Sequence, residues 1–289
     1  MNTTEIINSI KVKGQFPTDN YFSNSEYLVF MNDALKLDVA PLLIATNEEY
    51  FLENKEYSIS STTSYRIPPR AIGAKLRDVK IKDQSGNYKN ILRIFEEDRE
   101  ISMSGYYLKR NSIELSSDLL ITGTTLVLSY FAAPNELVLT SACAQVSSID
   151  TGLNQVVVSS LPSTITTGTV IDWVQNIPPY DLLSFDISVT GVSGTTLSFS
   201  SLPSGLLVND WVCVNRQSPM PMVPDELHQI LVQGSLVRCL AAKKDKAAEY
   251  EGGVLKEMKT VVTNLIDPRV ESNDIKIRGQ GLLTRVRRY

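Results

Sequence analysis

The chain has 289 residues, with 28 Lys and Arg against 32 Asp and Glu, one His and three Cys. The net charge of −4 argues against a surface built throughout to bind nucleic acid. One His excludes a zinc site that needs two imidazoles, and three scattered Cys cannot form a four-cysteine cage, so we expect no metal and no cofactor. The odd cysteine count favours reduced thiols over a disulfide framework. We also expect no membrane partner, because no apolar run approaches the roughly 18 residues that span a bilayer and residues 1–16 lack a signal-peptide core.

Residues 1–55 are predicted to be helical. Residues 23–26 are a plausible helix start, because Ser or Asn can cap free N–H groups and Glu26 favours the positive end of a helix. Pro41 is expected to break or kink the helix, with a second short helix reaching about Glu53. The apolar residues recur at three- and four-residue steps on one stripe: Leu28, Met31, Leu35, Val39 and Leu42.

Residues 56–138 are predicted to form an antiparallel β domain, because the apolar period changes to two. The alternation begins at residues 57–60 and returns at 80–82. The turn formers at 83–87 predict a hairpin whose return strand is 91–94. Three more strands are expected, at 106–108, 112–115 and 126–131.

Residues 139–218 are predicted to be an inserted β domain with two repeats of about 40 residues. Lys and Glu are absent between Glu136 and Glu226, and the abundance of Ser, Thr and Val favours strands and turns. Residues 156–163 match 197–204, and 171–174 match 209–212. The second match places Trp173 and Trp211 at the same position of the two copies, which we interpret as a two-unit barrel or sandwich.

Residues 219–267 are predicted to form a helical hairpin. Asp225 and Glu226 suit a helix start, and an apolar stripe follows through residues 227–241. The second helix carries its own apolar residues before Pro268: Ala247, Tyr250, Val254, Met258, Val261 and Leu265. Residues 268–289 form a tail with six basic residues against two acidic ones. The basic residues of the tail are Arg269, Lys276, Arg278, Arg285, Arg287 and Arg288.

The fold class expected from these elements is α+β. The N-terminal helices (1–55) would pack with residues 223–267 as a helical bundle, beside an antiparallel β domain that carries the inserted barrel or sandwich.

Three residues offer catalytic chemistry. His228 is the only imidazole available to a Ser-His-Asp or Cys-His mechanism, but an exposed or capping His is ordinary in the first turn of a helix. Asp172 and Asp210 offer a carboxylate pair for acid–base work or calcium, which would need the two groups within about 10 Å across a cleft. Duplication alone explains their matched positions, so we favour a structural role and expect no enzyme.

The remaining candidates are also interpreted structurally. Cys143, Cys213 and Cys239 have no CxxC spacing and are expected to be small buried hydrophobes. Trp173 and Trp211 could make a stacking platform for sugars or bases, although core packing is favoured. No GxxxxGK[ST] phosphate loop is present. The basic tail is expected to dock on another protein, with DNA phosphates as the alternative.

Four segments resemble the neck proteins of tailed bacteriophages, which are head-to-tail connectors, or adaptors, that form a ring beneath the portal. YRIPPRAIGAKLRDV (65–79) and LSYFAAP (128–134) resemble the start and the closing strand of their β domain. PDELHQILVQGSLVR (224–238) is similar to the family's P-x-E-L-H-x-x-L entry into the first C-terminal helix, and DKAAEYE (245–251) to the start of the second. The resemblance covers most of the chain, and the insert at 139–218 departs from it.

The resemblance implies a non-enzymatic virion protein of the neck or tail, made in the host bacterial cytoplasm. Such a protein forms a homo-oligomeric ring of twelve copies, joins the portal protein to tail or further neck proteins, and lines a conduit for double-stranded DNA. The alternative function is a carbohydrate- or surface-binding β module of a phage tail or cell-surface protein, with both tryptophans exposed. In the connector, the tail would dock on the portal or a neighbour, and the hairpin helices would supply the oligomer contacts: Leu227, Ile230, Leu231, Val237, Tyr250 and Met258.

Overall fold

The protein divides into two compact units that are both described by a computed structural model. The first unit comprises Met1–Asn47 with Pro134–Tyr289, and the second comprises Glu48–Ala133. The protein is α+β with antiparallel sheets, which confirms the predicted class. The structure describes residues 1–16, 21–47, 49–59, 63–95, 105–116, 123–178 and 180–265.

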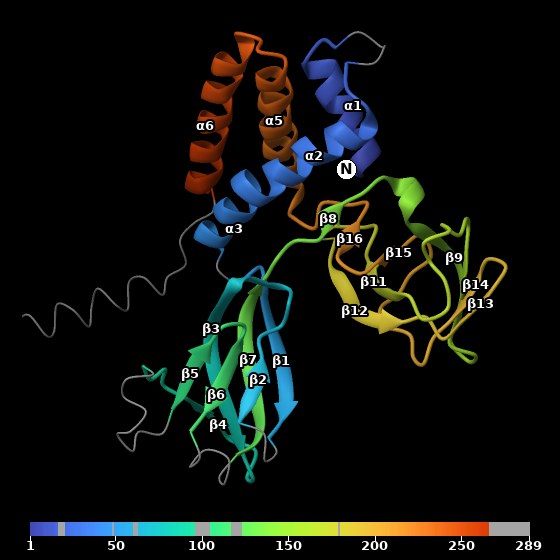
Figure 1. The fold of residues 1–289 in the computed structure, drawn as a ribbon. Helices are drawn as coiled ribbons and strands as arrows, with labels where there is room; N and C mark the ends of the chain where they lie inside the picture. Colours follow the sequence, from blue (N-terminus) through green and yellow to red (C-terminus); the bar gives the residue numbers. More distant parts are fainter. Residues whose placement is uncertain are drawn as a thin grey trace, which may run out of the picture. The chain divides into compact units, whose positions relative to one another are not determined.

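The α-helices of the described residues belong to the first unit (Figure 1). They are α1 (Thr3–Lys13), α2 (Asn24–Ala34), α3 (Ala40–Thr46), α5 (Asp225–Ala242) and α6 (Ala247–Leu265). α5 contacts α1, α2 and α6, and it is therefore the central helix of this group. Its apolar side chains are correspondingly buried: Leu227, Ile230, Leu231, Val232, Leu236 and Leu240.

The two N-terminal helices begin with the same capping device. At α2 the Ser23 hydroxyl accepts the Glu26 N–H, and the Glu26 carboxylate accepts the Ser23 N–H, as the sequence predicted for this start. α1 lies within the region predicted to be helical, but its start was not predicted, although Asn2 and Glu5 form an equivalent pair with both hydrogen bonds at 2.9 Å. The Asn-x-x-Glu spacing was therefore a usable signal for α1.

The predicted break at Pro41 and the helix to Glu53 are wrong. α2 continues through a π-helical turn, η1 (Leu35–Val39), directly into α3, which ends at Thr46. The Ala40 N–H donates to the Leu35 carbonyl five residues earlier, so the helix widens just before the proline. Pro41 then lies in the first turn of α3, directly after this wider turn.

The second unit consists of two antiparallel sheets. The larger sheet has the order β1-β7-β3-β4 and the smaller the order β2-β6-β5. Their strands are β1 (Leu52–Ser58), β2 (Ser64–Arg66), β3 (Ala71–Asp83), β4 (Tyr88–Asn90), β5 (Tyr106–Lys109), β6 (Ser112–Leu115) and β7 (Gly123–Ala132). Both sheets contribute to one core: Tyr65, Ile67, Ile113 and Leu115 with Val79, Ile81, Leu126 and Leu128.

The hairpin predicted around residues 83–87 is present, but its return strand is β4 and not residues 91–94. One carboxylate oxygen of Asp83 accepts the N–H groups of Ser85 and Asn87, at 2.8 and 2.9 Å. This tight turn lets pairing resume at once, with Tyr88 opposite Lys82. β1 likewise begins earlier than predicted, at Leu52 and not at residue 57.

The insert (residues 139–218) contains a seven-stranded sheet of the order β12-β11-β15-β9-β10-β14-β13. Its strands are β9 (Ala144–Asp150), β10 (Gln155–Val158), β11 (Val170–Val174), β12 (Leu182–Ser188), β13 (Gly191–Ser193), β14 (Thr196–Ser198) and β15 (Trp211–Val214). A short 3₁₀ helix, η3 (Thr140–Ala142), precedes them.

The register of this sheet relates the two repeats by an approximate twofold axis. Val156 pairs with Leu197, its own counterpart in the other repeat. Between β11 and β15, Trp173 pairs with Val212 and Val174 pairs with Trp211, so counterparts again exchange partners. Each repeat therefore completes its sheet with strands of the other.

Asn32 of α2 fixes the point where the chain enters the insert. Its side chain donates to the Leu137 carbonyl at 3.0 Å and accepts the Leu137 N–H at 2.7 Å, and the residue is buried. Leu137 lies in β8 (Glu136–Leu137), which pairs in parallel with β16 (Gln217–Ser218), the strand where the chain leaves the insert. Asn32 thus attaches β8 directly to α2, and β16 is held through its pairing with β8.

We predict that Asn32→Ala destabilises the first unit by about 2 kcal/mol, because it removes two buried hydrogen bonds and leaves both backbone groups of Leu137 unpaired. Chemical denaturation followed by circular dichroism measures the change. Asp33→Ala, at an exposed neighbouring position of α2, is the matched control. Equal stability of the two variants would contradict the role of Asn32.

Candidate functional site

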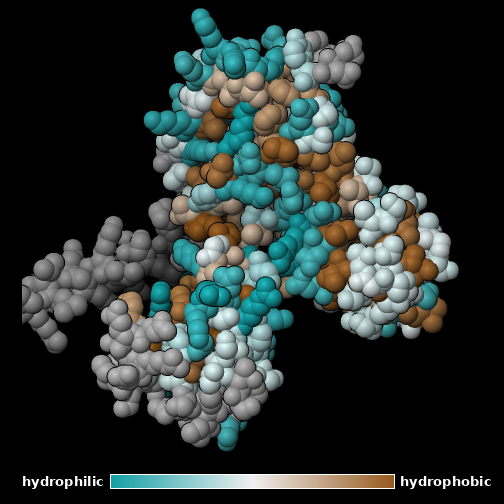
Figure 2. All heavy atoms as spheres, in the orientation of Figure 1, coloured by the Kyte–Doolittle hydropathy of each residue, from teal (hydrophilic) through white to brown (hydrophobic). Residues whose placement is uncertain are grey.

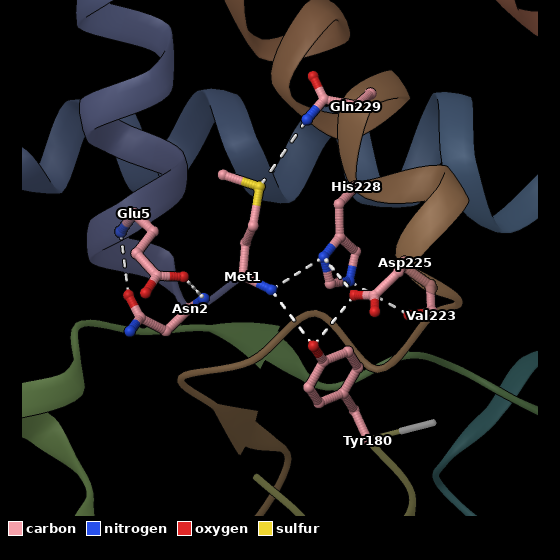
Figure 3. Close-up of polar contacts among 8 residues, drawn as sticks. All are labelled: Met1, Asn2, Glu5, Tyr180, Val223, Asp225, His228 and Gln229. Carbon is pink, nitrogen blue, oxygen red and sulfur yellow. Dashed lines mark hydrogen bonds and ion pairs between the residues drawn. The ribbon is translucent and has the colours of Figure 1, made fainter. Parts of the chain in front are cut away.

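A polar cluster joins the first turn of α5 to the N-terminus of the chain and to the insert (Figure 3). The Met1 amine lies 3.0 Å from His228 Nδ1 and 3.4 Å from the Tyr180 hydroxyl. The Tyr180 O–H donates to an Asp225 carboxylate oxygen at 3.0 Å. The rings of Tyr180 and His228 stack with their centroids 5.4 Å apart. Segments that are far apart in the sequence therefore meet at His228.

His228 is buried, with 1% of its surface exposed. The sequence had suggested an exposed or capping His. Its Nε2 lies 3.2 Å from the Val223 carbonyl oxygen, and its Nδ1 faces the ammonium of Met1, which can only donate. These two contacts fit a neutral ring with the proton on Nε2, whereas an Asp225 carboxylate oxygen 3.3 Å from Nδ1 favours the charged ring. Burial and the Met1 charge lower the pKa of His228, although Asp225 acts in the opposite direction. Burial and the bond to Asp225 raise the pKa of Tyr180 to about 12.

A second cluster joins three helices through one carboxylate. Asp38, in the π turn, accepts from Arg238 of α5 at 2.5 Å and from Lys259 of α6 at 2.6 Å. The Asp38 side chain is 11% exposed, so both ion pairs are largely shielded from water. Asp38 is about 200 residues away from Arg238 and Lys259 in the sequence. The two ion pairs therefore fix how the hairpin α5–α6 lies against α2 and α3.

Asp172 and Asp210 are buried in the insert and each accepts backbone N–H groups. Asp172 accepts the N–H of Arg216, which follows β15, at 2.8 Å. Asp210 accepts the N–H of Asn176, which follows β11, at 3.0 Å, and that of Leu207 at 2.8 Å. The aspartate of each repeat therefore holds the end of the strand that carries the tryptophan of the other repeat, β15 or β11. This gives both carboxylates a structural role.

The tryptophans and cysteines belong to the core of the first unit. Trp173 is fully buried and packs on Phe199, and Trp211 is 9% exposed. Neither indole is therefore open to a sugar or a base, contrary to what the carbohydrate-binding alternative requires. The cysteines are free and buried as predicted: Cys143, Cys213 and Cys239. Burial and the neighbouring Cys143 raise the pKa of the Cys213 thiol.

The predicted oligomer residues occupy different positions. Leu227, Ile230 and Leu231 lie inside the first unit, and Val237 and Met258 are half-buried. Tyr250 is 74% exposed. The six basic tail residues, Arg269, Lys276, Arg278, Arg285, Arg287 and Arg288, lie outside the described residues.

The outer surface of the helices carries apolar side chains among polar ones (Figure 2). On α6, Tyr250 and Val261 are exposed, and Val254 and Met258, on the same helical face, are half-buried. We call these four residues the α6 stripe. The sequence pattern identified all four residues, and two of them, Tyr250 and Met258, were among the predicted oligomer contacts. In the structure Leu255 is the buried apolar residue of α6. On α1, which also flanks α5, Val12 is 78% exposed.

Comparison with protein-family models and with curated proteins gives no match for this chain. Within the ranges that the structure describes, no helix is both long and apolar enough to cross a bilayer. The same residues contain no group of three or more His, Cys, Asp and Glu side chains that could hold a metal ion.

We predict that Asp38→Ala destabilises the first unit by about 2 kcal/mol, because Arg238 and Lys259 keep partly buried charges without a partner. Glu257→Ala, which removes an exposed carboxylate from α6, is the control. Thermal unfolding measures both variants. A loss in Asp38→Ala no larger than in the control would show that the ion pairs do not hold the hairpin.

We also predict that the imidazole of His228 titrates below the value of 6.5 of an ordinary His. The unfolded chain then binds this proton more tightly than the folded chain. The contribution of His228 to the free energy of unfolding is therefore complete above about pH 6.5, and it declines as the pH falls through that value. Since the chain has a single His, its imidazole resonance in a proton NMR titration is unambiguous. His228→Gln should flatten the loss of melting temperature between about pH 7.5 and pH 5.5. A pKa at or above 6.5 would contradict the burial argument.

Proposed function

We propose that this protein is a non-enzymatic structural component of a bacteriophage virion. It forms a ring that connects the capsid portal to the tail and lines the DNA conduit. Its partners are the portal protein, tail or further neck proteins, and other copies of itself, and it is assembled in the host bacterial cytoplasm. The resemblance of residues 65–79, 128–134 and 224–238 to connector proteins suggests this function.

The observation that carries the proposal is the α6 stripe. Tyr250 and Val261 expose apolar area to water on one face of α6. Contact with a partner would remove this area from water, which favours association. Neighbours in a ring meet through two different surfaces. The stripe on α6 and the exposed Val12 on α1 lie on two different helices that contact α5, and we assign one of them to each of the two surfaces. Twelve copies is the number that the resemblance implies.

The finer architecture follows the same proposal. The helices of the first unit form a bundle that makes the ring wall. The proposal keeps a barrel-like insert: its edge strands β12 and β13 are separated by two residues in the chain, although the described strands show no pairing between them. The barrel projects from the wall as a rigid module that is held by β8 and β16. The basic tail (268–289) docks on the portal or on a neighbouring subunit.

The test is the mass of the assemblies that the full chain forms alone and with its purified portal, measured by mass photometry and negative-stain microscopy. We expect rings on the portal for the wild type. A chain that stays monomeric alone and also forms no ring on the portal overturns the proposal.

A charge within the α6 stripe should prevent ring closure. We predict that Tyr250→Asp with Val261→Asp reduces ring formation at least tenfold, because a charge buried at an apolar interface costs several kcal/mol. The control is Lys256→Asp, an exposed position that the helical repeat of about 100° per residue places on the opposite face of α6. Unchanged melting temperatures show that folding is intact. Equal ring formation by both variants would remove α6 from the interface.

A further inference from the structure

The outer face of the small sheet in the second unit is strongly polar. Because side chains alternate along a strand, Tyr65 and Ile113 point into the core while their neighbours point outward. The outward set lines a hollow of about 530 Å³: Ser64, Arg66, Lys109, Arg110, Asn111, Ser112 and Glu114. A second hollow of about 330 Å³ shares Arg66 and Asn111 and continues along residues 67–74. We call the seven residues of the first hollow the basic face.

The charges of this face are unevenly neutralised. Glu114 is buried, accepts the Tyr107 O–H and forms an ion pair with Lys109 at 3.1 Å. Arg66 and Arg110 are exposed, and among the described residues neither guanidinium has an ion-pair partner. The only carboxylate among the seven residues is thus already engaged, and the face keeps two exposed guanidinium groups without an ion-pair partner among the described residues.

Arg110 owes its position to an unusual backbone. Lys109 pairs with Ser112, so β5 and β6 are joined by the two residues Arg110 and Asn111. A two-residue turn of this kind requires a left-handed conformation, and Arg110 has φ +54°. Asn, Asp or Gly meets that requirement at lower cost than Arg. The turn therefore places a guanidinium at the tip of the hairpin at some expense in local stability.

We propose that the basic face binds phosphates of duplex DNA. Arginine forks and serine hydroxyls are donors suited to phosphodiester oxygens, and the two connected hollows fit an extended polyanion better than a single small anion. The inference rests on the proposed function, because the ring supplies the conduit in which DNA meets the chain. It adds a specific contact surface to a protein whose net charge of −4 would otherwise repel the duplex.

The experiment measures the affinity of the full chain for a fluorescein-labelled duplex of about 20 base pairs by anisotropy, from about 50 to 200 mM salt. Three variants are compared at the same assembly state: wild type, Arg66→Ala with Arg110→Ala, and the control Lys55→Ala with Lys89→Ala. The control removes two exposed cations from β1 and β4 of the larger sheet. Arg66→Gln with Arg110→Gln replaces the alanine pair if that pair folds poorly.

We expect the arginine variant to bind at least tenfold more weakly at about 50 mM salt, and its slope of log affinity against log salt to fall by about two per bound copy. The slope of log affinity against log salt should change less in the control than in the arginine variant. Equal losses in both double variants would show that only total charge matters, and wild-type binding by the arginine variant, or no binding by the wild type, would overturn the inference. Mass photometry of the same samples separates these outcomes from failure of the proposed function, because rings on the portal without DNA binding refute only the basic face.

Discussion

The close approach of α5 to the π turn around Asp38 is the contact on which the first unit depends. A Cβ atom at Gly234 would lie 2.8 Å from an Asp38 carboxylate oxygen and 3.2 Å from the Ala34 Cβ, so any side chain there would push the two helices apart. Glycine costs about 1 kcal/mol relative to alanine inside a helix. Its presence in α5 is therefore explained by the space that Asp38 needs. With the helices this close, one carboxylate reaches both Arg238 and Lys259 and holds the whole hairpin.

The same helices also hold the insert, and they do so at both of its ends. Asn32 binds β8 at the entry, while the Thr3 N–H donates to the Pro219 carbonyl at 2.9 Å just beyond the exit. Tyr180, inside the insert, reaches His228 and Asp225 of α5. Three independent contacts therefore join the insert to α1, α2 and α5.

Local periodicity predicted the elements well, and long-range contacts decided what it missed. The helices at 225–242 and 247–265 and the turn at 83–87 follow from patterns within a few residues. The continuation through Pro41 depends on a π turn that no local rule supplies, and the burial of His228 depends on Met1 and Tyr180, which are distant in sequence. The α6 stripe was visible in the sequence, but only the packing of Leu255 shows which way it faces. The basic face was missed, although the alternation at residues 64–66 and 112–114 could have placed Arg66 on an outer face.

Six polar side chains of the first unit that are buried or nearly so share one property. Each of them is engaged by protein groups from a distant part of the chain: Asn32, Asp38, Asn135, Asp172, Asp210 and His228. Here the same groups are used to fix where one segment lies against another, and an unpaired partner would be costly in the low dielectric of the interior. Polar groups used in this way define a single arrangement of helices and insert. In the ring that we propose, this defined arrangement would let every copy present the same surfaces to its neighbours.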